Sequence, residues 1–228
     1  MAKKRVTRKQ LLKGPDEFIT FSNRMIKLGV AYKKQLMIGA GVFCAAVLIF
    51  VGLQYVSGRS QAKALSLLEN AVARYGQAIA SKGPLKAVEE VEKEFELILK
   101  KYASNAGGRL ARVTFAQYNF AAGRPERAIA LYEEALDDFN EAPFYKAIIE
   151  SGLGYAYALK GDPRKAISYF EQVVSGPEAG PISDALFNLG LLYSQTEQKD
   201  KSIGSFRRIK DEYPESFYSE LAARKANI

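Results

Sequence analysis

Hydrophobic and polar residues follow two patterns along this chain, and the first is an unbroken apolar stretch near the N-terminus. No residue between Lys34 and Arg59 is charged, and the stretch 36–56 holds 21 residues with Gln54 as its one strongly polar member. At about 1.5 Å per residue, such a helix is about 31 Å long, close to the roughly 30 Å hydrocarbon core of a bilayer. Residues 36–56 are therefore predicted to form a transmembrane helix.

The second pattern is a repeat of aromatic and small residues over the remaining chain. The aromatic residues Phe95, Tyr132, Phe170 and Phe206 are separated by 37, 38 and 36 residues. Within one period, apolar residues recur at helical spacing on both sides of the turn Gly161-Asp162-Pro163. Glycine suits a left-handed helix end and proline suits a first helical turn. Each period is thus predicted to be a pair of helices, and stacked pairs form an α-solenoid.

The repeat also predicts how particular residues pack. In the unit 147–182, Gly154 and Ala166 are expected to be small because two helices cross closely there, and Phe170 is expected to fill the next layer. The last residues, 213–228, are expected to form a capping helix, since an uncapped array would expose apolar surface. The residues expected to face the preceding unit from this cap are Tyr218, Leu221 and Ala222.

Charge sets the expected orientation of the membrane helix. Residues 1–35 contain ten Lys or Arg and two acidic residues, whereas the remaining chain contains 23 basic and 23 acidic residues. Because basic flanks stay on the cytoplasmic side, we expect residues 1–35 in the cytoplasm and residues 57–228 across the membrane. A cleaved signal peptide has a short basic leader and an apolar core of roughly 7–15 residues. Here the leader spans residues 1–35 and the apolar stretch has 21 residues, so an uncleaved anchor is the better interpretation.

The expected fold class is all-α, in four segments. These are a basic cytoplasmic leader (1–35), a transmembrane helix (36–56), a connecting helix (57–80) and a helical-repeat domain with a C-terminal cap (81–228). The leader carries apolar residues at helical spacing, which predicts an amphipathic helix on the inner leaflet. These residues are Phe18, Phe21, Met25, Leu28 and Tyr32. Small residues four apart in the transmembrane helix permit close helix packing, although ordinary apolar filler is the simpler explanation for them. They are Ala40, Gly41, Cys44 and Ala45.

Composition argues against catalysis. The chain has no His and no Trp, and its single cysteine is Cys44, which excludes disulfides within the chain, Cys–His zinc sites and His-based triads. The acidic run of residues 89–96 has the spacing of a solvated helix face. We therefore expect no enzyme, no metal and no cofactor, and no nucleic-acid partner, because membrane orientation already accounts for the basic leader.

The repeat resembles the tetratricopeptide repeat. The matching residues of unit 147–182 are Leu153, Gly154, Tyr157, Gly161, Ala166 and Phe170. Units 109–146 and 183–216 follow the same pattern, and residues 61–108 resemble a degenerate first unit. The departures from the pattern are Asn119, Asn140, Glu197 and Ser202. The resemblance implies a groove lined by the first helix of each unit. Its expected lining is Val113, Gln117, Phe120, Ser151, Tyr155, Ala158, Phe187, Leu191 and Ser194.

This lining is largely apolar and aromatic, and it lacks the basic clamp of family members that grip a carboxylate. It suits an extended or helical polypeptide, while the chain's own helix 61–79 or a second copy of the chain is the alternative occupant. Replacing Tyr155 or Phe187 with Glu is expected to weaken partner binding more than folding.

The order of leader, span and array is similar to that of single-span bacterial inner-membrane proteins with a periplasmic tetratricopeptide domain, typified by the ancillary subunit of the Sec translocon. That resemblance implies a scaffold that meets translocon subunits, exported polypeptides and periplasmic chaperones. The alternative is an assembly factor for envelope machinery such as cell-wall synthesis, pili or outer-membrane insertion, and a homo-oligomeric membrane scaffold is a third interpretation.

Overall fold

The computed structural model describes residues 17–176 and 181–226, and every regular element in these ranges is a helix. Their bounds are α2 (Glu17–Ala31), α3 (Lys33–Tyr102), α4 (Ala106–Ala121), α5 (Pro125–Asp138), α6 (Pro143–Lys160), α7 (Pro163–Ser175), α8 (Ile182–Gln195), α9 (Lys199–Glu212) and α10 (Ser219–Ala226). The chain divides into two compact units, Met1–Gly58 and Arg59–Ile228. Of the expected amphipathic face, the side chain of Phe18 lies outside the described part.

The first unit contains α2 and the beginning of α3. Every residue from 21 to 58 except Ser22 and Gly29 is exposed, including the large apolar side chains of the stretch 36–56. Helix α3 is long and apolar enough to cross a membrane, and none of its most apolar window is buried. The four small residues of the predicted packing stripe are exposed as well; they are Ala40, Gly41, Cys44 and Ala45.

The second unit begins with two helices that are both part of α3. Gly83 has φ 78° and ψ 170°, a conformation that glycine adopts without a Cβ penalty, and Pro84 starts the next helix. The two resulting segments, 59–82 and 84–102, each bury a stripe of residues at helical spacing. These residues are Ala64, Leu68, Ala71, Tyr75 and Ala78 on the first segment, and Ala87, Val88, Val91, Phe95 and Ile98 on the second.

Residues 59–82 therefore belong to the array. The sequence pattern had separated residues 57–80 as a connecting helix, but Tyr75 stacks on Tyr118 of α4 with ring centroids 3.5 Å apart. Ion pairs Arg74–Glu94 and Lys82–Glu90 join the two segments of α3 across the break. Much of the acidic run 89–96 is thus engaged in ion pairs.

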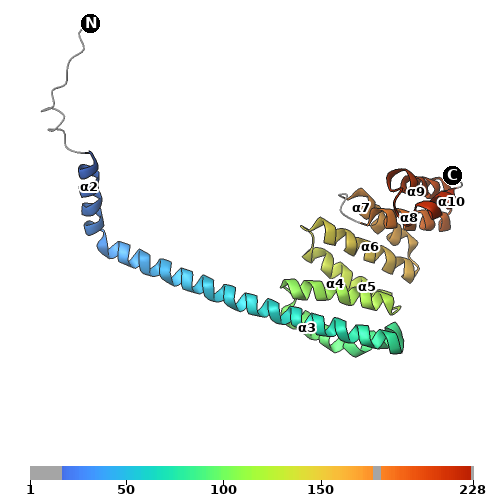
Figure 1. Ribbon diagram of the computed structural model, residues 1–228, viewed down its shortest axis with the longest axis horizontal. Helices are drawn as coiled ribbons and strands as arrows, with labels where there is room; N and C mark the ends of the chain where they lie inside the picture. Colours follow the sequence, from blue (N-terminus) through green and yellow to red (C-terminus); the bar gives the residue numbers. More distant parts are fainter. Residues whose placement is uncertain (1–16, 177–180, 227–228) are drawn as a thin grey trace, which may run out of the picture. The chain divides into compact units, whose positions relative to one another are not determined.

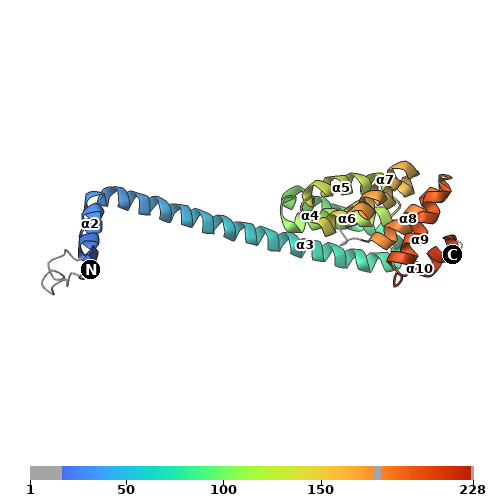
Figure 2. The ribbon, with the colours of Figure 1, turned by 90° about the horizontal axis from the view of Figure 1, so that it is seen from above.

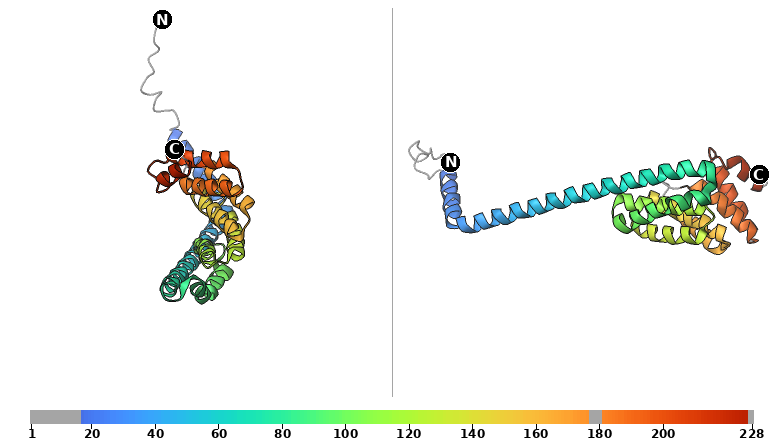
Figure 3. Two further views of the ribbon diagram at one scale, coloured as in Figure 1. Left: turned by 90° about the vertical axis from the view of Figure 1, so that its right-hand side faces the viewer. Right: turned by 90° about the horizontal axis from the view of Figure 1, so that it is seen from below.

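Three further pairs, α4–α5, α6–α7 and α8–α9, follow in order along the stack (Figure 1). Seen end-on, successive pairs step round in an arc (Figure 3, left). The turns within the pairs share one geometry, with positive φ at Gly123 (71°), Gly161 (82°) and Glu197 (63°). For a residue other than glycine this conformation costs about 1–2 kcal/mol, so Glu197 keeps the turn at the expense of local strain.

The small residues of the first helices make room for aromatic rings. A Cβ on Gly154 would lie 2.8 Å from the ring of Phe170, and a Cβ on Gly190 would lie 2.5 Å from the ring of Phe206. The prediction that Gly154 must be small is confirmed, but its close neighbour is a ring of its own pair and not a backbone. Phe170 accordingly fills its own pair, whereas Tyr132 reaches the next one, at Gly152.

A second set of contacts joins successive pairs at two of the interfaces. The Tyr157 hydroxyl donates to Glu133 Oε1 at 2.8 Å, and Lys165 Nζ lies 4.7 Å from the Tyr157 ring. Tyr193, Glu171 and Lys201 repeat this arrangement one pair later. The Tyr157 and Tyr193 hydroxyls thus fasten α5 to α6 and α7 to α8.

The first interface lacks this tyrosine. Asn119 stands in its place, fully buried, with its Nδ2 donating to Phe115 O at 2.8 Å and its Oδ1 without a partner in the described structure. Arg127 instead reaches Glu96 directly, at 3.8 Å.

Helix α10 closes the end of the array. Ala222 and Ala226 are buried in a small apolar cluster with residues of α8 and α9. Tyr218, just before the helix, stacks on Phe187 with ring centroids 4.6 Å apart. The prediction is confirmed for Tyr218 and Ala222 but was wrong for Leu221, which is 42% exposed because it projects from the opposite side of this short helix.

Candidate functional site

The candidate site is the face formed by the first helices of the pairs, namely residues 59–82 of α3, then α4, α6 and α8. The second helices α5 and α7 lie next to each other on the other side of the array (Figure 2). The residues that sequence analysis assigned to the face of first helices divide into two groups. Val113, Ser151 and Phe187 are buried between helices, whereas Gln117, Ala158, Leu191 and Ser194 are exposed and Phe120 and Tyr155 are half-buried.

The exposed and half-buried group is the surface that a partner could touch, and we call it the inner face. It comprises Gln117, Phe120, Tyr155, Ala158, Leu191 and Ser194. Phe120 of α4 and Tyr155 of α6 bring their rings to 5.9 Å, so two neighbouring pairs contribute to one aromatic surface. Residues 61–79 pack beside α4 as the next helix in the row, so they extend this row of first helices instead of lying across it.

Tyr155 is held in place by an acid and an amide from α8. Its hydroxyl donates to Asp184 Oδ2 at 2.5 Å and accepts from Asn188 Nδ2 at 2.9 Å. The Tyr218 hydroxyl donates to the other carboxylate oxygen, Asp184 Oδ1, at 2.7 Å. One carboxylate therefore fixes two rings, one from α6 and one from the segment before α10.

The network holds both tyrosines in their neutral form. Burial, followed by the hydrogen bond to Asp184, raises the pKa of Tyr155 well above its usual value. The same hydrogen bond, followed by burial, raises the pKa of Tyr218 to about 12. At neutral pH the hydroxyls of Tyr155 and Tyr218 thus both donate to the carboxylate of Asp184, next to the inner face.

Asp184, Asn188 and Tyr218 were not predicted as site residues. Asp184 and Asn188 lie four apart and share the helix turn that faces α6, but the repeat pattern assigns no role to these positions. Tyr218 belongs to the cap, which the resemblance treats as a cover and not as part of the inner face. The cap also explains why Phe187 is buried, because Tyr218 covers its ring.

Phe187 was therefore a wrong choice for a binding-specific substitution. It lies between Phe206 and Tyr218, so a Glu there would place a charge in the core. Glu at Tyr155 would place a second carboxylate beside Asp184. Both changes are expected to disturb folding as well as binding, and Leu191 and Gln117 are better positions for a test.

A separate hollow of about 550 Å³ lies away from the inner face, at the corner between α5 and α6. Arg109 of α4 borders it, with its guanidinium 5.9 Å from the ring of Phe139 and a hydrogen bond to Asp138 O at 3.3 Å. The ring of Tyr145 packs at 5.0 Å from Phe139. The positively charged group of this corner is thus used to hold the α5–α6 connection.

Comparison with known proteins identifies the repeats. Family models for the tetratricopeptide repeat match residues 109–179 and 184–216. The helix pairs α4–α5, α6–α7 and α8–α9 thus match the tetratricopeptide repeat in sequence. The first pair of the array, formed within α3, lies outside the matched residues. None of the curated proteins is significantly similar to the chain in sequence.

Solved structures share the fold of the tetratricopeptide repeats. One is a Podospora anserina kinesin light chain protein with nearly identical TPR-like repeats, at 17% identity and TM-score 0.55 over 71% of this chain and 82% of that one. A tetratricopeptide repeat protein from Parabacteroides merdae has 17% identity and TM-score 0.54, over 71% of this chain and 59% of that one. BtubC (BKLC) from P. vanneervenii has 21% identity and TM-score 0.49, over 54% of this chain and 55% of that one. The match thus spans just over half the length of the last two proteins.

Proposed function

We propose that this protein is a membrane-anchored scaffold whose inner face binds polypeptides on the far side of a bacterial inner membrane. The tetratricopeptide repeats make it a protein-interaction scaffold. The observation that supports the finer proposal is the contrast in exposure between the two units. Large apolar side chains are exposed all along residues 36–56, whereas the array buries most of its large apolar side chains and exposes scattered ones, among them Leu191 on the inner face.

The orientation follows from charge. Arg24 and Lys27 on α2, with Lys33 and Lys34, precede the apolar stretch and would remain on the cytoplasmic side. The same helix exposes Phe21, which would enter the inner leaflet. An exported array with a balanced charge would then stand in the periplasm, anchored by a single pass.

The partner class follows from the inner face. Phe120, Tyr155 and Leu191 come from three successive first helices, so an extended or helical segment lying along them could bury all three side chains. Aromatic side chains contribute large contact areas at interfaces. The proposed partners are exported polypeptides and periplasmic chaperones, with translocon subunits beside the membrane helix.

The translocon assignment rests on the resemblance in layout, and assembly of envelope machinery is the second candidate. Site-specific photo-crosslinking in cells distinguishes them. A crosslinker at Gly41 or Ala45 should yield translocon subunits under the first proposal and envelope synthases under the second. Products that contain only a second copy of the chain would contradict both and favour a homo-oligomeric scaffold.

The inner face is tested with a matched pair of positions. A crosslinker at Leu191, exposed on α8, should capture polypeptides, whereas one at Lys210, exposed on the outer side of α9, should not. Leu191→Glu should abolish partner capture while the array keeps its helical signal and melting temperature. Undiminished capture by the folded L191E variant would remove the inner face from the proposal.

A further inference from the structure

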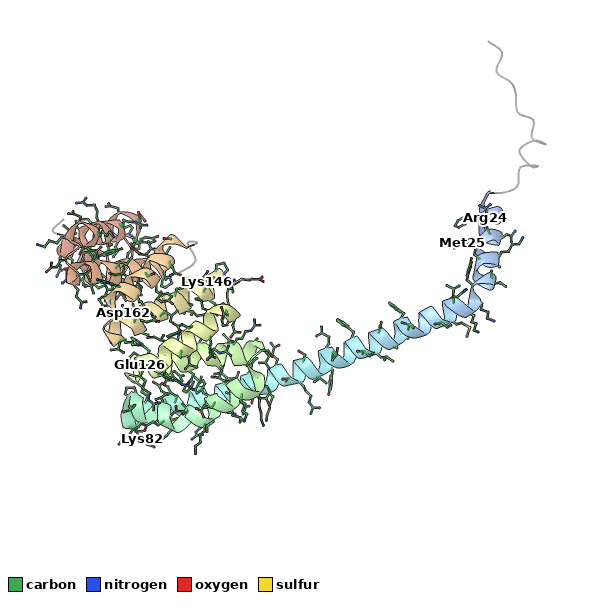
Figure 4. The ribbon with its side chains drawn as sticks, turned by 180° about the vertical axis from the view of Figure 1, so that it is seen from behind. Arg24, Met25, Lys82, Glu126, Lys146 and Asp162 are labelled. Carbon is green, nitrogen blue, oxygen red and sulfur yellow. The ribbon has the colours of Figure 1, made fainter. Side chains whose placement is uncertain are left out.

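A buried carboxylate in a second hollow is the group that the proposed inner face does not use. Glu150 lies on α6, and its side chain is only 7% exposed. It borders a hollow of about 360 Å³ between the start of α6 and the end of α7. The lining residues are Asn140, Pro143, Lys146, Ala147, Glu150, Gln172, Ser175 and Gly176. Lys146 marks its edge, on the side of the array opposite to Glu126 and Asp162 (Figure 4).

The carboxylate of Glu150 is poorly compensated. No hydrogen bond reaches it from the residues that the structure describes, and its ion pair with Lys146 Nζ has a length of 3.9 Å, beyond hydrogen-bonding distance. Lysine four residues before glutamate is also the weaker order for such a pair on a helix. Burial raises the pKa of Glu150, and the charge of Lys146 only partly opposes this rise. Buried charges normally have closer partners.

The end of helix α7, across the hollow from Lys146 and Glu150, also favours a positive ligand. Helix α7 ends at Ser175, so carbonyl groups of its last turn lack partners within the helix, and its dipole places partial negative charge there. Two of the lining side chains already donate within α7: Gln172 Nε2 bonds to Ser168 O at 3.4 Å, and Ser175 Oγ bonds to Glu171 O at 2.8 Å. The amide oxygen of Gln172 is left as a further acceptor.

We propose that this hollow, the Glu150 pocket, receives the guanidinium group of an arginine side chain from a bound polypeptide. A guanidinium group offers five donors in a planar fork, which suits acceptors spread over a carboxylate, an amide and a helix end. The pocket would add a second contact point to the scaffold, on a different face from Tyr155. This inference rests on the proposed role in binding polypeptides but not on the inner face or on the membrane assignment.

The probe is N-propylguanidinium, compared with its uncharged analogue N-propylurea. The full-length protein in detergent micelles is labelled with ¹³C at alanine methyl groups, and the methyl signal of Ala147, which lines the pocket, is followed during titration. The Ala147 signal should shift with saturation in the millimolar range with N-propylguanidinium and should not move with N-propylurea. The titration of the wild-type protein alone would overturn the proposal if the Ala147 signal showed no saturable shift, or if N-propylurea shifted it equally.

Two variants test whether the carboxylate of Glu150 binds the guanidinium group. Glu150→Gln keeps the shape and removes the charge, and it should weaken binding of N-propylguanidinium at least tenfold. Glu141→Gln removes an exposed carboxylate that does not line the pocket, and it should leave the affinity unchanged. Equal weakening in both variants, or none in E150Q, would overturn the proposal. Since no natural partner enters this experiment, its failure would leave the crosslinking test at Leu191 and Lys210 unaffected.

Discussion

Helix α3 contains two stretches of similar length with opposite surfaces. Residues 33–58 are exposed on every side although most are apolar, while residues 59–82 are more polar and bury a stripe that includes Ala64, Leu68 and Tyr75. An apolar stripe on one side of a helix needs a protein neighbour, whereas an apolar surface all round needs either a protein core or lipid. The contrast teaches that one helix can change near Gly58 from an apolar surface on every side to an apolar stripe on one side.

The largest effect is expected from truncation, when a fragment that keeps residues 59–80 is compared with one that lacks them. A fragment beginning at residue 59 should melt cooperatively at about the temperature of the array in the full-length protein. A fragment beginning at residue 81 loses the buried stripe that includes Leu68 and Tyr75, the latter stacked on Tyr118. It should lose about 5 kcal/mol or more, since large buried apolar side chains contribute about 1.5–3 kcal/mol each. Thermal melting followed by circular dichroism measures both fragments. Equal melting temperatures would show that residues 59–80 are only a connector.

Truncating one phenylalanine in each region comes next. Phe170→Ala removes a fully buried ring and should lower the free energy of unfolding by about 3–5 kcal/mol. Phe43→Ala, at a position that is 69% exposed, should leave the unfolding of the array unchanged. Chemical denaturation in detergent compares the two variants, and a similar loss in both would mean that the apolar stretch packs on the array.

Substituting alanine for one glycine in each region adds a single methyl group and again compares the packed array with the exposed apolar stretch. Gly190→Ala forces the ring of Phe206 to move and should cost about 1–3 kcal/mol, whereas a Cβ on Gly41 meets nothing within 4 Å. The melting temperature should therefore fall for G190A and stay constant for G41A. An unchanged melting temperature for G190A would contradict the close packing between α8 and α9.

The smallest expected effect concerns the contact between Tyr157 and Glu133. Burial and this hydrogen bond raise the pKa of Tyr157 to about 12, from about 10 in an unfolded chain. The neutral hydroxyl is thus favoured by folding, so its contribution is complete below pH 10 and is lost as pH rises toward 12. A single hydrogen bond of this kind is worth about 1 kcal/mol.

Unfolding of the wild type and of Tyr157→Phe is compared from pH 8 to pH 12, which cancels the titration of the lysines. The stability advantage of the wild type should shrink above pH 10. Tyr145→Phe, which changes an exposed tyrosine, is the control and should follow the wild type throughout. An advantage that stays constant up to pH 12 would contradict the assigned role of this hydrogen bond.

Sequence alone predicts the helix pairs well because their signals are local. Pro163 at a helix start, Gly161 at a helix end and the spacing from Tyr132 to Phe170 need no knowledge of the rest of the chain. The cap and its Tyr218 were predicted for a similar reason, since a stack of apolar faces must end on a cover.

The place of residues 59–82 was predicted only in part, because the sequence indicated both a degenerate first unit over 61–108 and a connecting helix over 57–80. The network around Asp184 could not be predicted in the same way. The buried stripe of residues 59–82 is rich in alanine, which gives weak hydrophobic periodicity, and Gly83 with Pro84 resembles a linker as much as a turn within a pair. Asp184 gains its role only when α6 and the segment before α10 converge on it. Such convergence depends on how the pairs stack, and no residue type or spacing in the sequence indicates it.

The reactivity of Cys44 tests the central claim most directly, because the chain has no other cysteine. The claim is that residues 36–56 lie in the bilayer while the segment from residue 59 lies in water. A membrane-impermeant charged maleimide needs a thiolate, which hydrocarbon surroundings suppress. In open membrane fragments, where the reagent reaches both sides of the bilayer, Cys44 should stay unlabelled. The exposed position 66 of a C44A/S66C variant should be labelled fully. Labelling of Cys44 at the rate of the S66C thiol would contradict the account.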